Sequence, residues 1–183
     1  QGNSNGIPYK LNRANLAATW CFVNNIDHYL TIPRQIGKTQ SILANLTWAY
    51  LFGTTNSSFA FFATSQELAS ENLERLKAQR ELLPSYLQLR QDCVVDQVLG
   101  TKDNEIDNIR KIYNPLTKNT IVTKPKASSK EAAVKLGRGN TLPITYMDEA
   151  EFINFIDEIM MASGLNLGSN KTSLIAGTSL IKR

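Results

Sequence analysis

The feature that most constrains this chain is the triplet Gly37-Lys38-Thr39, which lies between two apolar segments. The run from His28 to Ile32 predicts a β-strand, and the apolar periodicity from Lys38 to Leu51 predicts a helix. A strand, a short loop and a helix in this order are typical of a phosphate-binding loop. In such a loop, backbone N–H groups and the first helical turn point at the phosphates.

Each residue of the triplet has a physical reason to be there. Lys38 is expected to neutralise the β- and γ-phosphates, and the Thr39 hydroxyl is expected to bind Mg²⁺. Gly37 allows a close backbone approach that a Cβ would block. The predicted nucleotide-binding segment comprises Arg34, Gln35, Ile36, Gly37, Lys38, Thr39 and Gln40.

The segment departs from the usual pattern G-x-x-x-x-G-K-[ST], because Ile32 replaces the first glycine and Pro33 follows it. Arg34 adds a second cation beside the expected phosphates. Chance is the alternative explanation, since such a triplet occurs in roughly one chain in ten of this length. The flanking strand and helix patterns favour the nucleotide site.

Composition limits the class of protein. The chain has 183 residues, 42% of them hydrophobic and 20% charged, which is enough for one globular domain with a real core. No apolar run approaches the length of a membrane span. Two cysteines and one histidine cannot supply a four-ligand zinc site, and reduced thiols inside a cell are expected. A net charge of +4 is compatible with a polyanionic partner.

The remaining pattern predicts a mostly parallel α/β sheet, because strands and helices alternate. We expect an arm over residues 1–8 and one domain over residues 9–183. Predicted helices cover 11–26, 38–51 (with Gly53 as C-cap), 66–83, 129–136 and 153–165, and predicted strands cover 28–32, 59–63, 142–147 and 174–176. Segments 109–114 and 120–124 predict a hairpin, and 88–104 is ambiguous. Trp20 and Trp48 are expected to pack.

A second informative stretch is the apolar segment Leu142–Met147, which delivers Asp148 and Glu149 at its C-terminal end. Open α/β sheets bind ligands at that end of their strands. Asp148 would hold Mg²⁺ through its water shell, and Glu149 would orient and polarise the attacking water. The alternative is an apolar strand followed by an acidic turn.

Taken together, these motifs resemble the large terminase subunit of tailed bacteriophages. The similarity lies in the deviant phosphate loop after Ile32, the acidic stretch 146–153, the segment 136–141, the Ala63-Thr64-Ser65 start of a helix that ends in Glu81–Pro84, and the final Gly177-Thr178-Ser179. The match runs from about Tyr9 to Ser179. Its specificity comes from five modest motifs in the right order.

The resemblance implies a Mg²⁺-dependent ATPase motor that moves double-stranded DNA into a viral capsid. It implies a P-loop NTPase fold of the additional-strand, catalytic-glutamate type. It also implies a homo-oligomeric ring on the capsid portal, a small terminase subunit as possible partner, and a place in the host cytoplasm. Carried over residue by residue, the resemblance makes Glu149 the catalytic glutamate, Lys38 and Thr39 the ligands of phosphate and Mg²⁺, and Asp148 the second Mg²⁺ anchor. Arg34 would sense the γ-phosphate, and Arg138 could act on a neighbouring subunit's nucleotide. Thr178 and Ser179 would couple hydrolysis to movement.

The chain departs from the family's pattern in two respects, and two alternative functions stay open. The family usually has a glutamine upstream of the phosphate loop that contacts the base, and Asn15 is the nearest substitute here. The family's nuclease domain would follow the final motif, so this piece is not expected to cut DNA. The alternatives are a helicase-like P-loop ATPase and a nucleotide-gated DNA-binding module with negligible turnover. Helicases need a second similar domain, for which this chain has no room.

Overall fold

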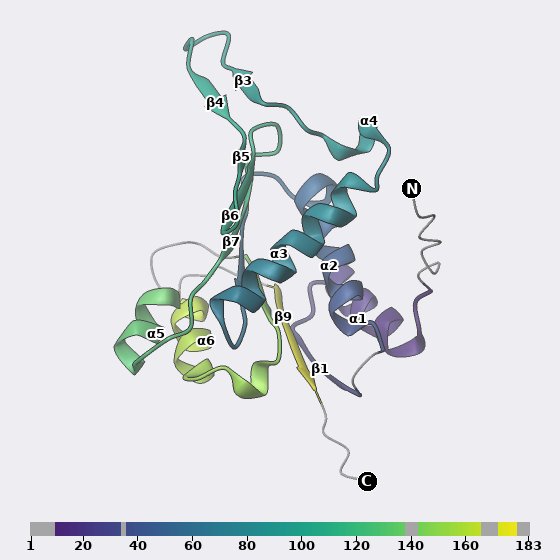
Figure 1. Ribbon diagram of the computed structural model, residues 1–183, viewed down its shortest axis with the longest axis vertical. Helices are drawn as coiled ribbons and strands as arrows, with labels where there is room; N and C mark the ends of the chain where they lie inside the picture. Colours follow the sequence, from purple (N-terminus) through teal and green to yellow (C-terminus); the bar gives the residue numbers. More distant parts are fainter. Residues whose placement is uncertain (1–9, 34–35, 138–142, 166–171, 179–183) are drawn as a thin grey trace.

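The computed structural model describes residues 10–33, 36–137, 143–165 and 172–178. Helices cover both faces of a twisted sheet (Figure 1). The helices are α1 (Arg13–Val23), α2 (Lys38–Trp48), α3 (Gln66–Glu81), α4 (Ser85–Gln88), α5 (Lys130–Gly137) and α6 (Ile156–Leu165), with a π-helical turn at Ala49–Gly53 and a 3₁₀ turn at Ala150–Phe152. The strands are β1 (His28–Ile32), β2 (Ser58–Phe62), β3 (Cys93–Val95), β4 (Lys102–Asn104), β5 (Ile106–Asp107), β6 (Lys111–Asn114), β7 (Asn119–Thr123), β8 (Ile144–Met147) and β9 (Thr172–Thr178).

The main sheet confirms the predicted fold class. Its strand order is β1-β9-β8-β2-β7-β6-β5, and neighbours from β1 to β7 are parallel. Strand β9 therefore separates β1, which leads into the phosphate loop, from β8, which ends at the acidic pair. This inserted strand is the arrangement that the resemblance implies. The predicted hairpin is confirmed as well, because β6 pairs antiparallel with β7, and β5 extends it.

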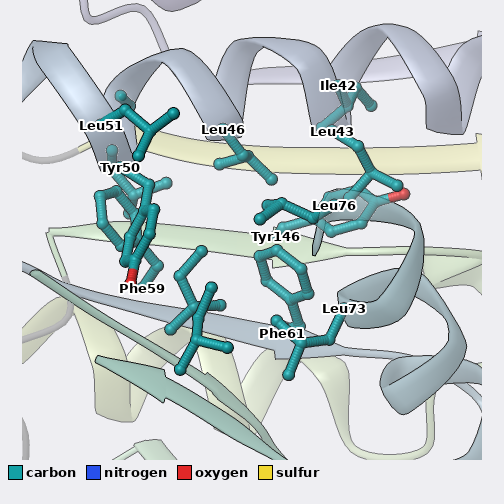
Figure 2. Packing of buried hydrophobic residues seen from close by; sticks show 14 of the residues in the cluster. Ile42, Leu43, Leu46, Tyr50, Leu51, Phe59, Phe61, Leu73, Leu76 and Tyr146 are labelled. Carbon is teal, nitrogen blue, oxygen red and sulfur yellow. The ribbon is translucent and has the colours of Figure 1, made fainter. Parts of the chain in front are cut away.

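The core lies on both faces of strand β2, as its uninterrupted apolar sequence predicts. Phe59 and Phe61 pack against α2 and α3, where Leu43, Leu46 and Leu73 are fully buried (Figure 2). On the opposite face, Ala60 and Phe62 belong to a second cluster with residues of α5 and α6. The buried segment therefore holds β8, its parallel neighbour, rigidly within the sheet.

The second predicted helix differs from the structure at its end. The α-helix stops at Trp48 and continues as a π-helical turn, so Gly53 is the last residue of that turn and not a C-cap. Asn119, fully buried on β7, donates its amide to the carbonyls of Tyr50 and Thr54, both at 2.7 Å. Carbonyls at this helix end are thus satisfied by a distant strand, which the local sequence does not reveal.

Three further observations concern the ambiguous segment, the two tryptophans and membrane spans. The ambiguous segment forms the two-stranded sheet β3–β4, which projects from the body of the molecule (Figure 1). Trp20 and Trp48 are 61% and 51% exposed, so neither is a core residue, although the Trp48 ring lies against Gly53. Within the described residues, no helix combines the length and apolarity that a membrane span requires.

Candidate nucleotide-binding site

The geometry around Gly37 fits a phosphate loop. Gly37 is the N-cap of α2 and adopts a left-handed conformation, with φ 75° and ψ 22°. A residue with a Cβ is strained there, so glycine is the residue this turn requires. Lys38 and Thr39 form the first turn of α2, where backbone N–H groups without helical partners attract anions.

Two asparagines from α1 and its N-cap fix the backbone beside this turn. The side-chain amides of Asn12 and Asn15 both donate to the carbonyl of Ile36, at 3.1 and 3.3 Å. Asn15 is only 1% exposed. The structure therefore places the nearest substitute for the family's base-contacting glutamine against the loop backbone instead of in an open pocket.

The second half of the site meets the first at Asp148. Asp148 follows β8 and is 5% exposed, and its Oδ2 accepts from the Thr39 hydroxyl at 3.5 Å. Its Oδ1 accepts from the backbone N–H of Glu149 at 3.1 Å. The two predicted Mg²⁺ ligands, 109 positions apart in sequence, are therefore in contact.

Glu149 adopts a left-handed backbone conformation, with φ 50° and ψ 47°. This conformation is uncommon for a residue with a side chain and costs of order 1–3 kcal/mol. It turns the chain sharply from buried β8 into the 3₁₀ turn, so that Glu149 is partly exposed beside the buried Asp148. Strain of this kind is typical of functional positions.

Two buried polar residues join Asp148 that sequence reasoning missed. Asn72, on α3 and 1% exposed, donates its amide to Asp148 Oδ2 at 3.0 Å. Tyr146, two residues before Asp148, is fully buried, and Figure 2 shows its oxygen at the Ile42–Leu43 end of α2. A polar residue next to the apolar Ala69, Leu73 and Leu76 on the inner face of α3 was the available signal for Asn72.

Within the described part of the chain, the Tyr146 hydroxyl has no partner at standard hydrogen-bond geometry. Burial raises its pKa well above the ordinary value, and the nearby charge of Asp148 adds to this effect. The phenol is therefore neutral at physiological pH. A hydroxyl donor close to Thr39 and Asp148 enriches the polar surroundings of the two predicted Mg²⁺ ligands.

The donor atoms at this point fit Mg²⁺. The Thr39 hydroxyl and the Asp148 carboxylate are hard oxygen ligands, the kind that Mg²⁺ prefers. Among the described residues, no group of three or more His, Cys, Asp or Glu side chains could form a metal cage. Mg²⁺ commonly binds through one or two protein oxygens, substrate phosphates and water, so such a cage is not needed.

The other predicted site residues divide into two groups. Thr178 ends β9 in register with Ile32, so it lies at the edge from which the phosphate loop departs. Gln40, in contrast, lines a groove between α2 and α3 together with Ala44 and Gln79. Four predicted residues lie outside the described residues: Arg34, Gln35, Arg138 and Ser179. Their roles, like those of Lys38 and Glu149, stay predictions.

Comparison with known proteins finds solved structures with a similar fold. No family model matches the chain, and no curated protein does. Among solved structures, the large terminase of a thermophilic bacteriophage has a TM-score of 0.62 at 10% identity, covering 92% of this chain and 39% of that one. The ATPase domain of the large terminase from Thermus phage P74-26 has a TM-score of 0.54 at 16% identity, covering 95% of this chain and 67% of that one.

The structural neighbours are thus large terminase ATPase domains, and at these identities the likeness establishes the fold. The first of these terminases has also been solved with ATP-γ-S, in a form with a TM-score of 0.57 at 12% identity, covering 91% of this chain and 38% of that one. This chain spans about two fifths of that terminase chain.

Proposed function

We propose that this chain is an ATPase motor domain of the large terminase kind, which hydrolyses Mg-ATP to move double-stranded DNA. The observation that carries the proposal is the contact between Thr39, at the head of α2, and Asp148, at the end of β8. This contact joins the two motifs identified from the sequence on a fold shared with terminase ATPase domains.

The chemistry follows from the residues at the site. Lys38 and the N-terminus of α2 bind the phosphates and offset their charge. Thr39 and Asp148 would hold Mg²⁺, which, when bound, neutralises charge that develops on the phosphates. Glu149, partly exposed next to Asp148, orients and polarises the attacking water.

DNA as the partner is part of the proposal and rests on charge and on the resemblance. The net charge is +4, and a basic stretch includes Lys124, Lys126, Lys130 and Lys135. Two of these lysines are less available to DNA. Lys130 pairs with Glu158 at 3.1 Å, and burial lowers the pKa of Lys124. The exposed Lys126 and Lys135 are therefore the better candidates for phosphate contacts. We place the motor in the host cytoplasm, where viral DNA is packaged.

Single-turnover ATP hydrolysis, measured with and without double-stranded DNA, tests the proposal. A motor domain hydrolyses ATP, and DNA changes its rate. Nucleotide-dependent DNA binding with negligible turnover under both conditions would instead identify a nucleotide-gated binding module. Strand separation coupled to hydrolysis would identify a helicase-like ATPase.

The ring arrangement makes a separate prediction through Arg138, which sits between two glycines in the sequence. If Arg138 acts on a neighbour's ATP, Arg138→Ala barely changes the basal rate of the monomer but abolishes the stimulated rate of assembled motors. Mixing Arg138→Ala with Glu149→Gln subunits recovers some activity, because one interface then has both residues intact. No recovery in mixed rings, or a large loss of monomer activity in Arg138→Ala, contradicts an action in trans.

A further inference from the structure

Asn72 is the buried polar residue that the proposed chemistry does not yet use. Its neighbours on the inner face of α3 are Ala69, Leu73 and Leu76, all fully buried. Placing an amide at 1% exposure in such a face costs free energy unless its polar atoms are satisfied. Yet the one hydrogen bond that its side chain makes within the described part of the chain is to Asp148, at 3.0 Å.

The chemistry of the pair fixes how the amide is turned. An ionised carboxylate only accepts hydrogen bonds, so the Nδ2 group of Asn72 must face Asp148 and its Oδ1 must face away. That Oδ1 has no partner among the described residues. A buried acceptor left unsatisfied costs about 1–3 kcal/mol, which stability alone does not explain. The hydrogen bond from Asn72 instead serves to orient the Asp148 carboxylate.

Asp148 is held from three directions. Thr39 and Asn72 both donate to Oδ2, while the backbone N–H of Glu149 donates to Oδ1. Thr39 is itself a predicted Mg²⁺ ligand, and its contact with Asp148, at 3.5 Å, is the longest of the three. If Thr39 turns to the ion, Asn72 still donates to Oδ2.

We propose that Asn72 is a positioning residue that orients the Asp148 carboxylate toward Mg²⁺ and so sets the Mg²⁺ affinity of the nucleotide site. The inference rests on the proposed function, since it assumes that Asp148 serves a Mg-nucleotide. Residues that hydrogen-bond to metal ligands typically change metal affinity about 10–100-fold when they are replaced.

The test is a Mg²⁺ titration of fluorescent ADP binding, followed for the wild type and for Asn72→Leu. Leucine has a similar size and no donor. The Mg²⁺ concentration for half-maximal tightening of ADP binding is expected to rise about tenfold or more. ADP affinity without Mg²⁺ should stay unchanged, which a merely structural defect would not produce. Asn72→Ser, whose hydroxyl is too short to reach Asp148, should shift the midpoint in the same direction.

The matched control is Ser70→Ala, which also removes a buried polar group from α3. The Ser70 hydroxyl contacts Gln66 at 3.3 Å and not Asp148, so its loss should leave the Mg²⁺ midpoint unchanged. An unshifted midpoint in folded Asn72→Leu and Asn72→Ser overturns the inference and leaves the proposed function standing. Loss of cooperative unfolding in both variants assigns Asn72 to folding and also overturns it. If the wild type shows no Mg²⁺-dependent binding, the proposed function itself fails.

Discussion

At the scale of single residues, the structure gives neighbouring carboxylates different surroundings. Asp148 is buried and accepts three hydrogen bonds, whereas Glu149 is partly exposed on a left-handed turn. A fixed, buried carboxylate suits a role in holding a cation, and an accessible one suits contact with water. The sequence motif and the resemblance assigned these two roles, which stay predictions.

Two substitutions test this division. Glu149→Gln should keep Mg-ATP binding but lower turnover by roughly a hundredfold or more, because water activation is lost and little else changes. Asp148→Asn should instead weaken the Mg²⁺ dependence of ATP binding. Binding and single-turnover rates measured across a Mg²⁺ series separate the two effects. Glu151→Gln, an exposed carboxylate two residues further on, should change neither quantity. Identical behaviour of the Asp148 and Glu149 variants would refute the division.

At the scale of elements, α3 connects the site to the projecting β3–β4 sheet. One end of α3 begins at its N-cap Ser65, whose side chain accepts from the N–H of Leu68, as the Ala63-Thr64-Ser65 motif suggested. Near the other end, Arg80 is 2% exposed and pairs with Asp107 at 2.7 Å and with Glu105 at 3.5 Å. These ion pairs fasten β5, from which the projecting sheet departs, to the helix.

The ion pair between the buried Arg80 and Asp107 makes a prediction about stability. Burial alone would raise the pKa of Asp107, but hydrogen bonds from Lys77 and Arg80 and their positive charges hold it below its ordinary value. The ionised form is thus favoured by folding, so its contribution is present at neutral pH and is lost as the pH falls below about 4. Asp107→Asn should therefore destabilise the protein by about 1–3 kcal/mol at pH 7, since Arg80 loses a charged partner.

Denaturant unfolding at pH 7 and at pH 3 measures this effect, and the difference from wild type should shrink at the lower pH. The control is Glu71→Gln, which breaks the exposed pair between Glu71 and Arg75, at 2.6 Å. An exposed pair of this kind contributes only about 0.3–0.5 kcal/mol. Equal destabilisation by both substitutions, or a loss in Asp107→Asn that does not depend on pH, would contradict the account.

At the scale of the whole molecule, the sequence predicted what depends on local pattern. The strand and helix beside Gly37, the buried strand β2 and the β6–β7 hairpin follow from periodicity and turn residues. The place of β9 between β1 and β8 came from the resemblance, because strand order depends on long-range pairing. Asn72 and Asn119 escaped prediction for the same reason, since their partners are 76 and up to 69 positions away.

The central claim is that Gly37, Lys38 and Thr39 bind nucleotide phosphates at the edge of the sheet where Asp148 lies. Equilibrium binding of Mg-ATP to the wild type and to Lys38→Ala tests it most directly. The control is Lys102→Ala, which removes an exposed lysine from the projecting strand β4. We predict that the wild type and Lys102→Ala bind Mg-ATP, while Lys38→Ala loses binding and retains its thermal unfolding transition. Unchanged affinity in folded Lys38→Ala would contradict the nucleotide site.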